Sequence, residues 1–356
     1  MALPFFDSGS RKRRDQMLAV DLGSRTTKAV HLQRRGDGFA LCRYAMLDAP
    51  IFEKSLSPEL LSEHLRAVSA ALDAKIKTVA LTVGVNDALV RHVEMPRMPV
   101  DDMRSVLKLN SRAYLQQDLS NYVFDCHVVP PRDGAPEPAK AAGGQARQKI
   151  LVAGAKRQLV DDYLEGARGA GLSVEFIGPG LIGPVNSFET ALPEVFAKEV
   201  VALVDVGFRC SSICILQEGE LILSRVVGIG GDRLTAALSE SMNISYAEAE
   251  GIKVGMASEV QTALDSVLTP LGRELRASVD FFEHQQDRPV SQAFITGGSA
   301  RSDSILQTLA TELMVECKTW NPTTAMQMAL PAQQAAEIEQ VAPQLTVALG
   351  AALAAL

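Results

Sequence analysis

Residues 18–28 read Leu-Ala-Val-Asp-Leu-Gly-Ser-Arg-Thr-Thr-Lys, and residues 202–212 read Ala-Leu-Val-Asp-Val-Gly-Phe-Arg-Cys-Ser-Ser. The two stretches align without a gap, and the alignment continues as far as Gln33 and Gln217. In both, an apolar run that suits a buried strand ends at an aspartate, and a glycine that permits a tight turn follows. The repeat therefore predicts two similar lobes, each beginning with a strand, a turn and a returning strand.

A third strand follows each copy of the repeat. The polar reversal at residues 35–38 leads into an apolar segment at 39–46, and the reversal at 218–219 leads into one at 221–227. This spacing is typical of antiparallel strands joined by short turns, so each lobe should start with a three-stranded meander. The repeat by itself is also compatible with a duplicated hairpin that has no chemical role.

The paired turns have the composition of a phosphate-binding site. Backbone N–H groups in turns rich in glycine, serine and threonine can point at phosphate oxygens. Asp21 and Asp205 are placed to order the water shell of Mg²⁺, because this ion keeps much of its hydration when bound. The residues predicted to hold the phosphates are Gly23, Ser24, Thr26, Thr27, Lys28, Gly207 and Ser211. Lys28 could equally face solvent, and Phe208, in the place of Ser24, either crowds the phosphates or points into the core.

Two further glycine clusters extend this prediction. A strand at residues 292–296 is followed by Gly297, Gly298 and Ser299 and then by a predicted helix at 302–316. A strand, a glycine pair and a helix N-terminus suit a sugar or an α-phosphate. The other cluster follows the second meander and opens another helix; it consists of Gly230, Gly231 and Asp232.

Composition excludes several classes of protein. The net charge of −7 and the single tryptophan argue against a nucleic-acid binder. The five cysteines are scattered and odd in number, which indicates free thiols in a reducing compartment. The apolar residues 3–6 precede the basic run 11–14, the reverse of a signal peptide, and the apolar stretch 345–356 is too short to span a bilayer. A cytoplasmic protein, or one held at a membrane by a partner, is expected.

These motifs resemble the superfamily of actin, Hsp70 and the sugar kinases. Within it the chain resembles the PilM family of type IV pilus assembly, itself similar to the cell-division protein FtsA. The closer resemblance rests on residues 79–96, 118–129, 149–177, 230–232, 247–253 and 347–352. It implies an α/β fold with two ribonuclease-H-like lobes around a nucleotide cleft and a small α/β subdomain inserted in the first lobe.

The resemblance also implies a division of the chain. The expected parts are a flexible basic tail (1–15), the first lobe (16–84 and 166–199), the inserted subdomain (85–165, with a mobile loop at 130–148), the second lobe (200–335, with a helical subdomain at 231–289) and a closing helix (336–356). In the helical subdomain, Ser245 and Glu248 fit a capping box. The resemblance puts Glu250 and Lys253, which share a helix face, beside the adenine and ribose; the alternative is a solvated ion pair worth about 0.2–0.5 kcal/mol.

The resemblance implies an ATP-binding scaffold with Mg²⁺, peripheral at the inner face of the inner membrane. Its partner would be the cytoplasmic N-terminal segment of a PilN-like membrane protein, bound in a groove that involves residues between about 85 and 114; other pilus platform or motor proteins are possible partners. Hydrolysis needs a residue that orients water, and the sequence offers only Asn186 and Glu189, so ATPase activity should be slow or undetectable. A sugar or small-acid kinase, using Asp87 or the Asp101–Asp102 pair, and a filament-forming protein are the alternatives.

Overall fold

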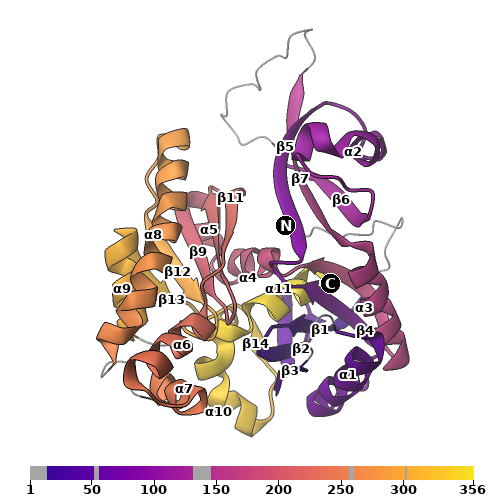
Figure 1. Ribbon diagram of the computed structural model, residues 1–356. Helices are drawn as coiled ribbons and strands as arrows, with labels where there is room; N and C mark the ends of the chain where they lie inside the picture. The colour runs from indigo at the N-terminus through magenta and orange to yellow at the C-terminus, as the bar shows by residue number, and fades with distance from the viewer. Residues whose placement is uncertain (1–13, 52–55, 131–145, 256–259, 301–302) are drawn as a thin grey trace. The chain divides into compact units, whose positions relative to one another are not determined.

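Two sheets with the same strand order form the two halves of the protein (Figure 1). The computed structural model describes residues 14–51, 56–130, 146–255, 260–300 and 303–356. Most of the predicted N-terminal tail and of the predicted loop at 130–148 lies outside these residues. The chain divides into a first unit (1–22, 26–186 and 348–356) and a second unit (23–25 and 187–347).

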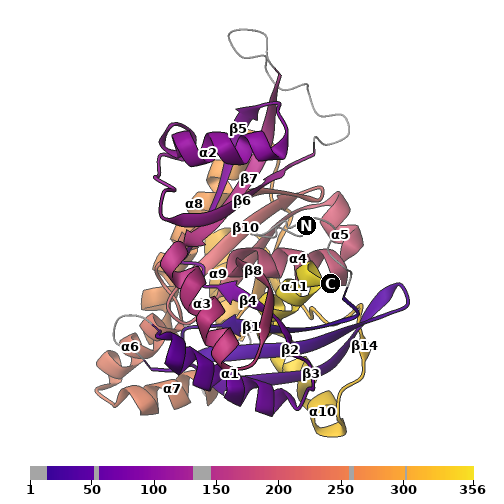
Figure 2. The ribbon, with the colours of Figure 1, turned by 90° about the vertical axis from the view of Figure 1, so that its right-hand side faces the viewer.

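The sheet of the first unit runs in the order β3-β2-β1-β4-β8. Its strands are β1 (Gln16–Leu22), β2 (Thr26–Arg35), β3 (Gly38–Asp48), β4 (Thr78–Val83) and β8 (Ser173–Pro179). The first three form the predicted antiparallel meander, whereas β4 and β8 continue the sheet in parallel with β1. Helices α1 (Pro58–Leu72) and α3 (Arg157–Gly169) lie side by side and bury their apolar sides in one cluster with the strands (Figure 2).

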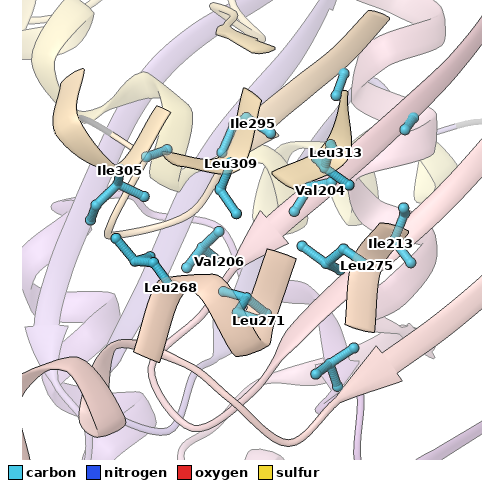
Figure 3. Packing of buried hydrophobic residues seen from close by; sticks show 14 of the residues in the cluster. Val204, Val206, Ile213, Leu268, Leu271, Leu275, Ile295, Ile305, Leu309 and Leu313 are labelled. Carbon is cyan, nitrogen blue, oxygen red and sulfur yellow. The ribbon is translucent and has the colours of Figure 1, made fainter. Parts of the chain in front are cut away.

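The sheet of the second unit repeats this plan in the order β11-β10-β9-β12-β13. Its strands are β9 (Val200–Val206), β10 (Ser211–Gln217), β11 (Glu220–Val227), β12 (Gln292–Thr296) and β13 (Glu316–Thr319). Its helices include α5 (Pro193–Lys198), α6 (Gly231–Met242), α7 (Tyr246–Gly255), α8 (Gln261–Gln286) and α9 (Asp303–Leu313). Leucines of α8 and α9 interlock with valines and isoleucines of β9 and β12 in its core (Figure 3). The duplication predicted from the repeated turns therefore extends beyond the two meanders and includes the parallel strands beside them.

A small three-stranded sheet is inserted between β4 and α3. It is formed by β5 (Ala88–Pro96), β6 (Tyr122–Val128) and β7 (Arg147–Lys156), paired antiparallel in the order β5-β7-β6. Helix α2 (Val100–Leu115) packs on it through Met103 and Leu107, which share an apolar cluster with Met95 and Ile150. Strands β6 and β7 pair from Tyr122 opposite Lys156 to Val128 opposite Ile150.

The boundary between the units differs from the predicted one. The chain passes from the first unit to the second inside α4 (Gly183–Ala191), not near residue 200, and returns inside α11 (Thr346–Ala355). The expected closing helix is also two helices, because the segment 342–344 between α10 (Ala332–Val341) and α11 is a 3₁₀ turn. That turn contains Pro343, which has no N–H to continue an α-helix.

The described residues also bear on the predictions about cysteines and membrane spans. All five cysteines are free thiols. No single helix in the described ranges is long and apolar enough to cross a membrane; only the segments 332–344 and 346–355 taken together meet that test, and they are bent by 91°. The remaining elements are the short strand β14 (Gln327–Met328) and a 3₁₀ turn (Gly180–Ile182) between β8 and α4.

Candidate functional site

Asp21 lies at the end of β1 between two side chains that the sheet register brings to it. Its direct neighbours across the sheet are Lys28 on β2 and Thr82 on β4. Directly opposed residues point to the same face of a sheet, and Lys28 Nζ donates to Asp21 Oδ2 at 3.2 Å while Thr82 Oγ1 donates to Oδ1 at 3.3 Å. The carboxylate is thus held on both sides at the carboxyl end of two parallel strands, where α/β sheets bind their ligands.

Asp205 occupies the same place in the second unit. Its neighbours across the sheet are Ser212 on β10 and Thr296 on β12. Thr296 Oγ1 donates to Asp205 Oδ1 at 3.4 Å, as Thr82 does to Asp21. The sequence repeat identified both aspartates but missed both threonines, since these lie on later strands that the repeat does not include.

The three polar residues after the first turn do not share one face. Thr26 and Lys28 point to one side of β2 and Thr27 to the other, because side chains alternate along a strand. Thr27 is fully buried, and its hydroxyl lies 2.7 Å from Nε2 of His64 on α1. Burial lowers the pKa of His64 below its ordinary value, which favours a neutral ring. The Thr27 hydroxyl is therefore already hydrogen-bonded on the helix-covered face of the sheet. If Thr27 binds a phosphate, it must do so through its backbone N–H.

Lys28 does not face solvent, the alternative open from sequence, because its ammonium contacts Asp21. At the turn itself, Gly23 is half-buried and Ser24 is exposed. Phe208 does not point into the core either: its ring is half-buried in the second unit, and the guanidinium of Arg25, grouped with that unit, lies 5.1 Å from the ring centroid.

The second aspartate–glycine turn packs tightly against the start of α6. The amide of Gly231 donates to Gly207 O at 2.9 Å, and the amide of Asp232 donates to Phe208 O at 2.8 Å. A Cβ on Gly230 would lie 2.5 Å from Phe208 O, so only glycine allows this approach. The residues of this turn and of the cluster at 230–232, which were predicted to bind nucleotide, therefore lie next to each other. The backbone N–H groups of Gly231 and Asp232 are used in hydrogen bonds that hold the turn rigid.

Ser211, like Thr27, has a hydroxyl that is already hydrogen-bonded within the protein. Its hydroxyl is buried and donates to Ile229 O at 2.7 Å. Its predicted part in phosphate binding would therefore also depend on the backbone.

The third glycine turn reaches over the end of β9. Gly297 has a φ of +96°, and a Cβ there would lie 2.4 Å from Val206 O and 2.5 Å from Asp205 Oδ1. Only glycine tolerates both the conformation and the contact. Ser299 Oγ and Lys253 Nζ also pack closely on Gly231, 3.2 and 3.6 Å from where its Cβ would be. Gly298 is open on the same turn.

Glu250 and Lys253 form an ion pair in which Lys253 is buried and Glu250 is half-buried, so it is not the solvated pair of the alternative. The Lys253 side chain is 8% exposed, and its ammonium donates to Glu250 Oε2 at 2.7 Å, to Thr235 Oγ1 at 2.8 Å and to Gly231 O at 3.2 Å. Burial alone would raise the pKa of Glu250, but hydrogen bonds from Lys253 and Thr235 outweigh it and lower the pKa below its ordinary value.

The helix that carries this pair begins as predicted. Ser245 N donates to Glu248 Oε2 at 2.9 Å and Glu248 N to Ser245 Oγ at 3.3 Å, which is a capping box. Tyr246, which the sequence did not single out, donates its hydroxyl to Asp232 at 2.6 Å. Burial and this bond raise the pKa of Tyr246 to about 12.

The two weak catalytic candidates lie on α4. Asn186 is buried, and its amide donates to Gly350 O of α11 at 3.2 Å. It also lines a pocket of the first unit with Thr82 and Pro179. Glu189, one turn later, is half-buried.

The donor set suits a hydrated Mg²⁺ and a nucleotide. In the described ranges no three His, Cys, Asp or Glu side chains gather in a way that could hold a metal ion. Within each unit, a carboxylate at a strand end that is oriented by a hydroxyl is the kind of group that binds this ion through its water shell.

Comparisons with known proteins agree on one superfamily. The family model described as type IV pilus assembly protein PilM matches residues 19–356. The cell division protein FtsA of Bacillus subtilis (strain 168) is 22% identical over 254 residues, which cover 66% of this chain and 57% of FtsA. FtsA of Agrobacterium fabrum is 24% identical over 250 residues, 64% of this chain and 54% of its own length. The chain thus matches little more than half the length of these curated relatives.

Solved structures show the same fold. The structure described as the PilM-PilN type IV pilus biogenesis complex superposes with a TM-score of 0.83 at 22% identity, covering 97% of this chain and 99% of that one. EutJ, an ethanolamine utilization protein of Carboxydothermus hydrogenoformans, gives 0.55 at 14% identity, with 96% and 90% covered. MreB5 of Spiroplasma citri bound to AMPPNP gives 0.52 at 9%, with 95% of each chain covered. The predicted actin-like fold is confirmed.

Proposed function

The chain belongs to the type IV pilus assembly protein PilM family, and from this we propose that it is an ATP-binding, actin-like scaffold of a pilus or related secretion assembly platform. The observation that carries the nucleotide part is the repeated pair of an aspartate and a threonine at the same register position in both sheets. An actin-like relative, MreB5, was solved with AMPPNP, which supports a nucleoside triphosphate as the ligand.

Each group of residues has a distinct part in this proposal. Asp21 and Asp205 order the water shell of Mg²⁺, which neutralises phosphate charge when bound. Ser24, Thr26 and Lys28 hold phosphates from the first loop, and the turn at 297–299 faces the sugar or the α-phosphate. Glu250, held by Lys253, offers its carboxylate to the ribose hydroxyls.

We propose that the nucleotide acts as a conformational ligand more than as a substrate. A ligand that contacts the phosphate loops of both units binds better to a closed arrangement and so shifts the population toward it. The amide of Asn186, the first of the two water-orienting candidates, is engaged with Gly350. We therefore expect turnover well below one per second, and a metabolite screen that finds a phosphate acceptor would favour the kinase alternative.

We propose that the partner is the cytoplasmic N-terminal segment of a PilN-like inner-membrane protein. The structure that superposes over 97% of this chain is described as a PilM-PilN complex. In this chain the inserted subdomain carries Leu109 on α2 with 88% of its surface exposed, so this side chain is available for contact with such a segment and is the place to test the proposal. Such a partner would hold the protein at the inner face of the inner membrane.

The nucleotide part is tested by titration calorimetry with ATP, with and without Mg²⁺. The wild type should bind more tightly with Mg²⁺, and the double variant Asp21→Ala with Asp205→Ala should lose that gain, about tenfold or more in Kd. Unchanged binding by the double variant would show that the two aspartates do not form the site.

The partner part is tested with a synthetic peptide of the PilN-like N-terminus. Leu109→Glu should weaken peptide binding about tenfold, since a charge would have to be buried, and leave ATP binding unchanged. Met314→Glu is the matched control, because Met314 is also an exposed apolar residue (76%) but lies in the second unit. Equal effects of the two variants would count against a surface on α2.

A further inference from the structure

Two residues of the site, Thr82 and Thr296, belong to no sequence motif that predicts a role for them. Both are buried, at 2% and 0% exposure, and both direct Oγ1 to the Oδ1 atom of the aspartate on the neighbouring parallel strand. The register is equivalent: Thr82 stands opposite Asp21, and Thr296 stands opposite Asp205. The same contact therefore occurs twice, on strands outside the repeated segments of sequence.

The contact restricts how each carboxylate can rotate. A buried hydroxyl needs a partner, and a hydrogen bond to an ionised acceptor is about twice as strong as one between neutral groups. With Oδ1 held from within the sheet, the other carboxylate oxygen has a defined direction at the strand end. In the first unit that oxygen receives Lys28 Nζ.

We propose that Thr82 and Thr296 are positioning residues for the Mg²⁺–nucleotide complex: each holds its aspartate in the orientation that orders the metal's water shell. The proposal rests on the proposed function, since it needs a nucleotide with Mg²⁺ at these aspartates. It adds that metal-dependent affinity is set by two hydroxyls that touch neither metal nor nucleotide.

Both threonines also adjoin α11. Thr296 Oγ1 lies 3.3 Å from Oγ1 of Thr346, the first residue of that helix, and Thr82 lines a pocket together with Ala351. The return from the second unit to the first lies between residues 347 and 348 of the same helix.

The test replaces each threonine by valine, which keeps the shape and removes the hydroxyl, and by serine, which keeps the hydroxyl. ATP affinity is measured by calorimetry across a Mg²⁺ titration and again in excess EDTA. Thr82→Val and Thr296→Val should each lose about tenfold of the affinity that Mg²⁺ adds, with little change in EDTA. Thr82→Ser and Thr296→Ser should recover most of the loss.

Thr323→Val is the matched control, because Thr323 is also buried but donates to Asn321 in its own turn. If a valine variant does not fold, Thr82→Ala and Thr296→Ala remove the same hydroxyl with less steric demand. Equal weakening with Mg²⁺ and in EDTA, or no recovery by serine, would indicate a purely structural role and overturn the proposal. A wild type that binds no ATP would instead refute the proposed function.

Discussion

At the scale of single residues, the least expected feature is an ammonium group enclosed by protein acceptors. Lys253 donates to a carboxylate, a hydroxyl and a backbone carbonyl that belong to α6 and α7. Burying a charge is costly unless it is paired and hydrogen-bonded, and here both conditions hold. The pair therefore orients Glu250 and secures the start of α6 at the same time.

Removing the cation alone should be more harmful than removing the pair. Lys253→Met leaves the Glu250 carboxylate with less compensation and should cost about 2–3 kcal/mol of unfolding free energy. The double variant Lys253→Met with Glu250→Gln should regain part of that loss. Urea denaturation measures both; equal stability of the single and double variants would show that the two side chains are not coupled.

The same pair predicts an acid-side dependence of stability. The pKa of Glu250 is lower in the folded protein than its ordinary value of 4.5, so the unfolded chain takes up the proton first. Its contribution is complete above the unfolded pKa and is lost as pH falls through the folded pKa. Glu250→Gln should therefore differ most from the wild type near neutral pH, and the difference should shrink as the pH falls below the ordinary carboxyl pKa and through the folded one, as followed by unfolding at several pH values.

At the scale of elements, glycine determines how closely α4 and α11 approach. A Cβ on Gly350 would lie 1.9 Å from Gly183 O, and Asn186 bridges the same two helices. Both contacts lie within the first unit. Helices α4 and α11, in which the chain passes from one unit to the other, are thus in backbone contact.

Gly350→Ala should destabilise the protein by about 1–3 kcal/mol, because the added methyl group overpacks a tight contact. Gly251→Ala on α7 is the control: nothing lies within 4 Å of its added Cβ, and alanine in a helix should stabilise by about 0.5–1 kcal/mol. Thermal melts of both variants give the signs, and a neutral Gly350→Ala would contradict the close packing.

At the scale of the whole molecule, the two units can be observed separately. Trp320 is the single tryptophan of the sequence, it is buried in the second unit, and its ring packs edge-on against Phe188 at 5.2 Å between centroids. Tryptophan fluorescence therefore reports on the second unit, whereas far-ultraviolet circular dichroism reports on both.

A nucleotide that contacts both units should couple their unfolding. ATP with Mg²⁺ at about one hundred times Kd should stabilise by about 2.7 kcal/mol and bring the fluorescence and dichroism midpoints together. The variant Asp205→Ala should show neither effect. A rise in the fluorescence midpoint alone would mean that the nucleotide binds one unit and leaves the other uncoupled.

The local signals in the sequence were sufficient for much of this protein. The repeated aspartate–glycine turns, the meanders, the capping box at Ser245 and the glycine clusters depend on residues close together in the chain, where strand, turn and cap preferences act directly. The order of these motifs along the chain resembles that of the actin-like proteins and so predicted the actin-like fold, which the family match and the superpositions confirm. The predicted roles of individual nucleotide residues remain predictions.

What the sequence could not determine depends on contacts between distant strands and helices. Strand alternation turned Thr27 toward His64, register brought Thr82 and Thr296 to the aspartates, and packing of α6 on α7 buried the lysine of a pair that had looked equally suited to solvent. Register and burial are properties of the assembled sheets, so no single stretch of chain encodes them. The duplicated turns predict where a nucleotide binds, and the tertiary structure shows which of the predicted side chains are already engaged by other protein groups.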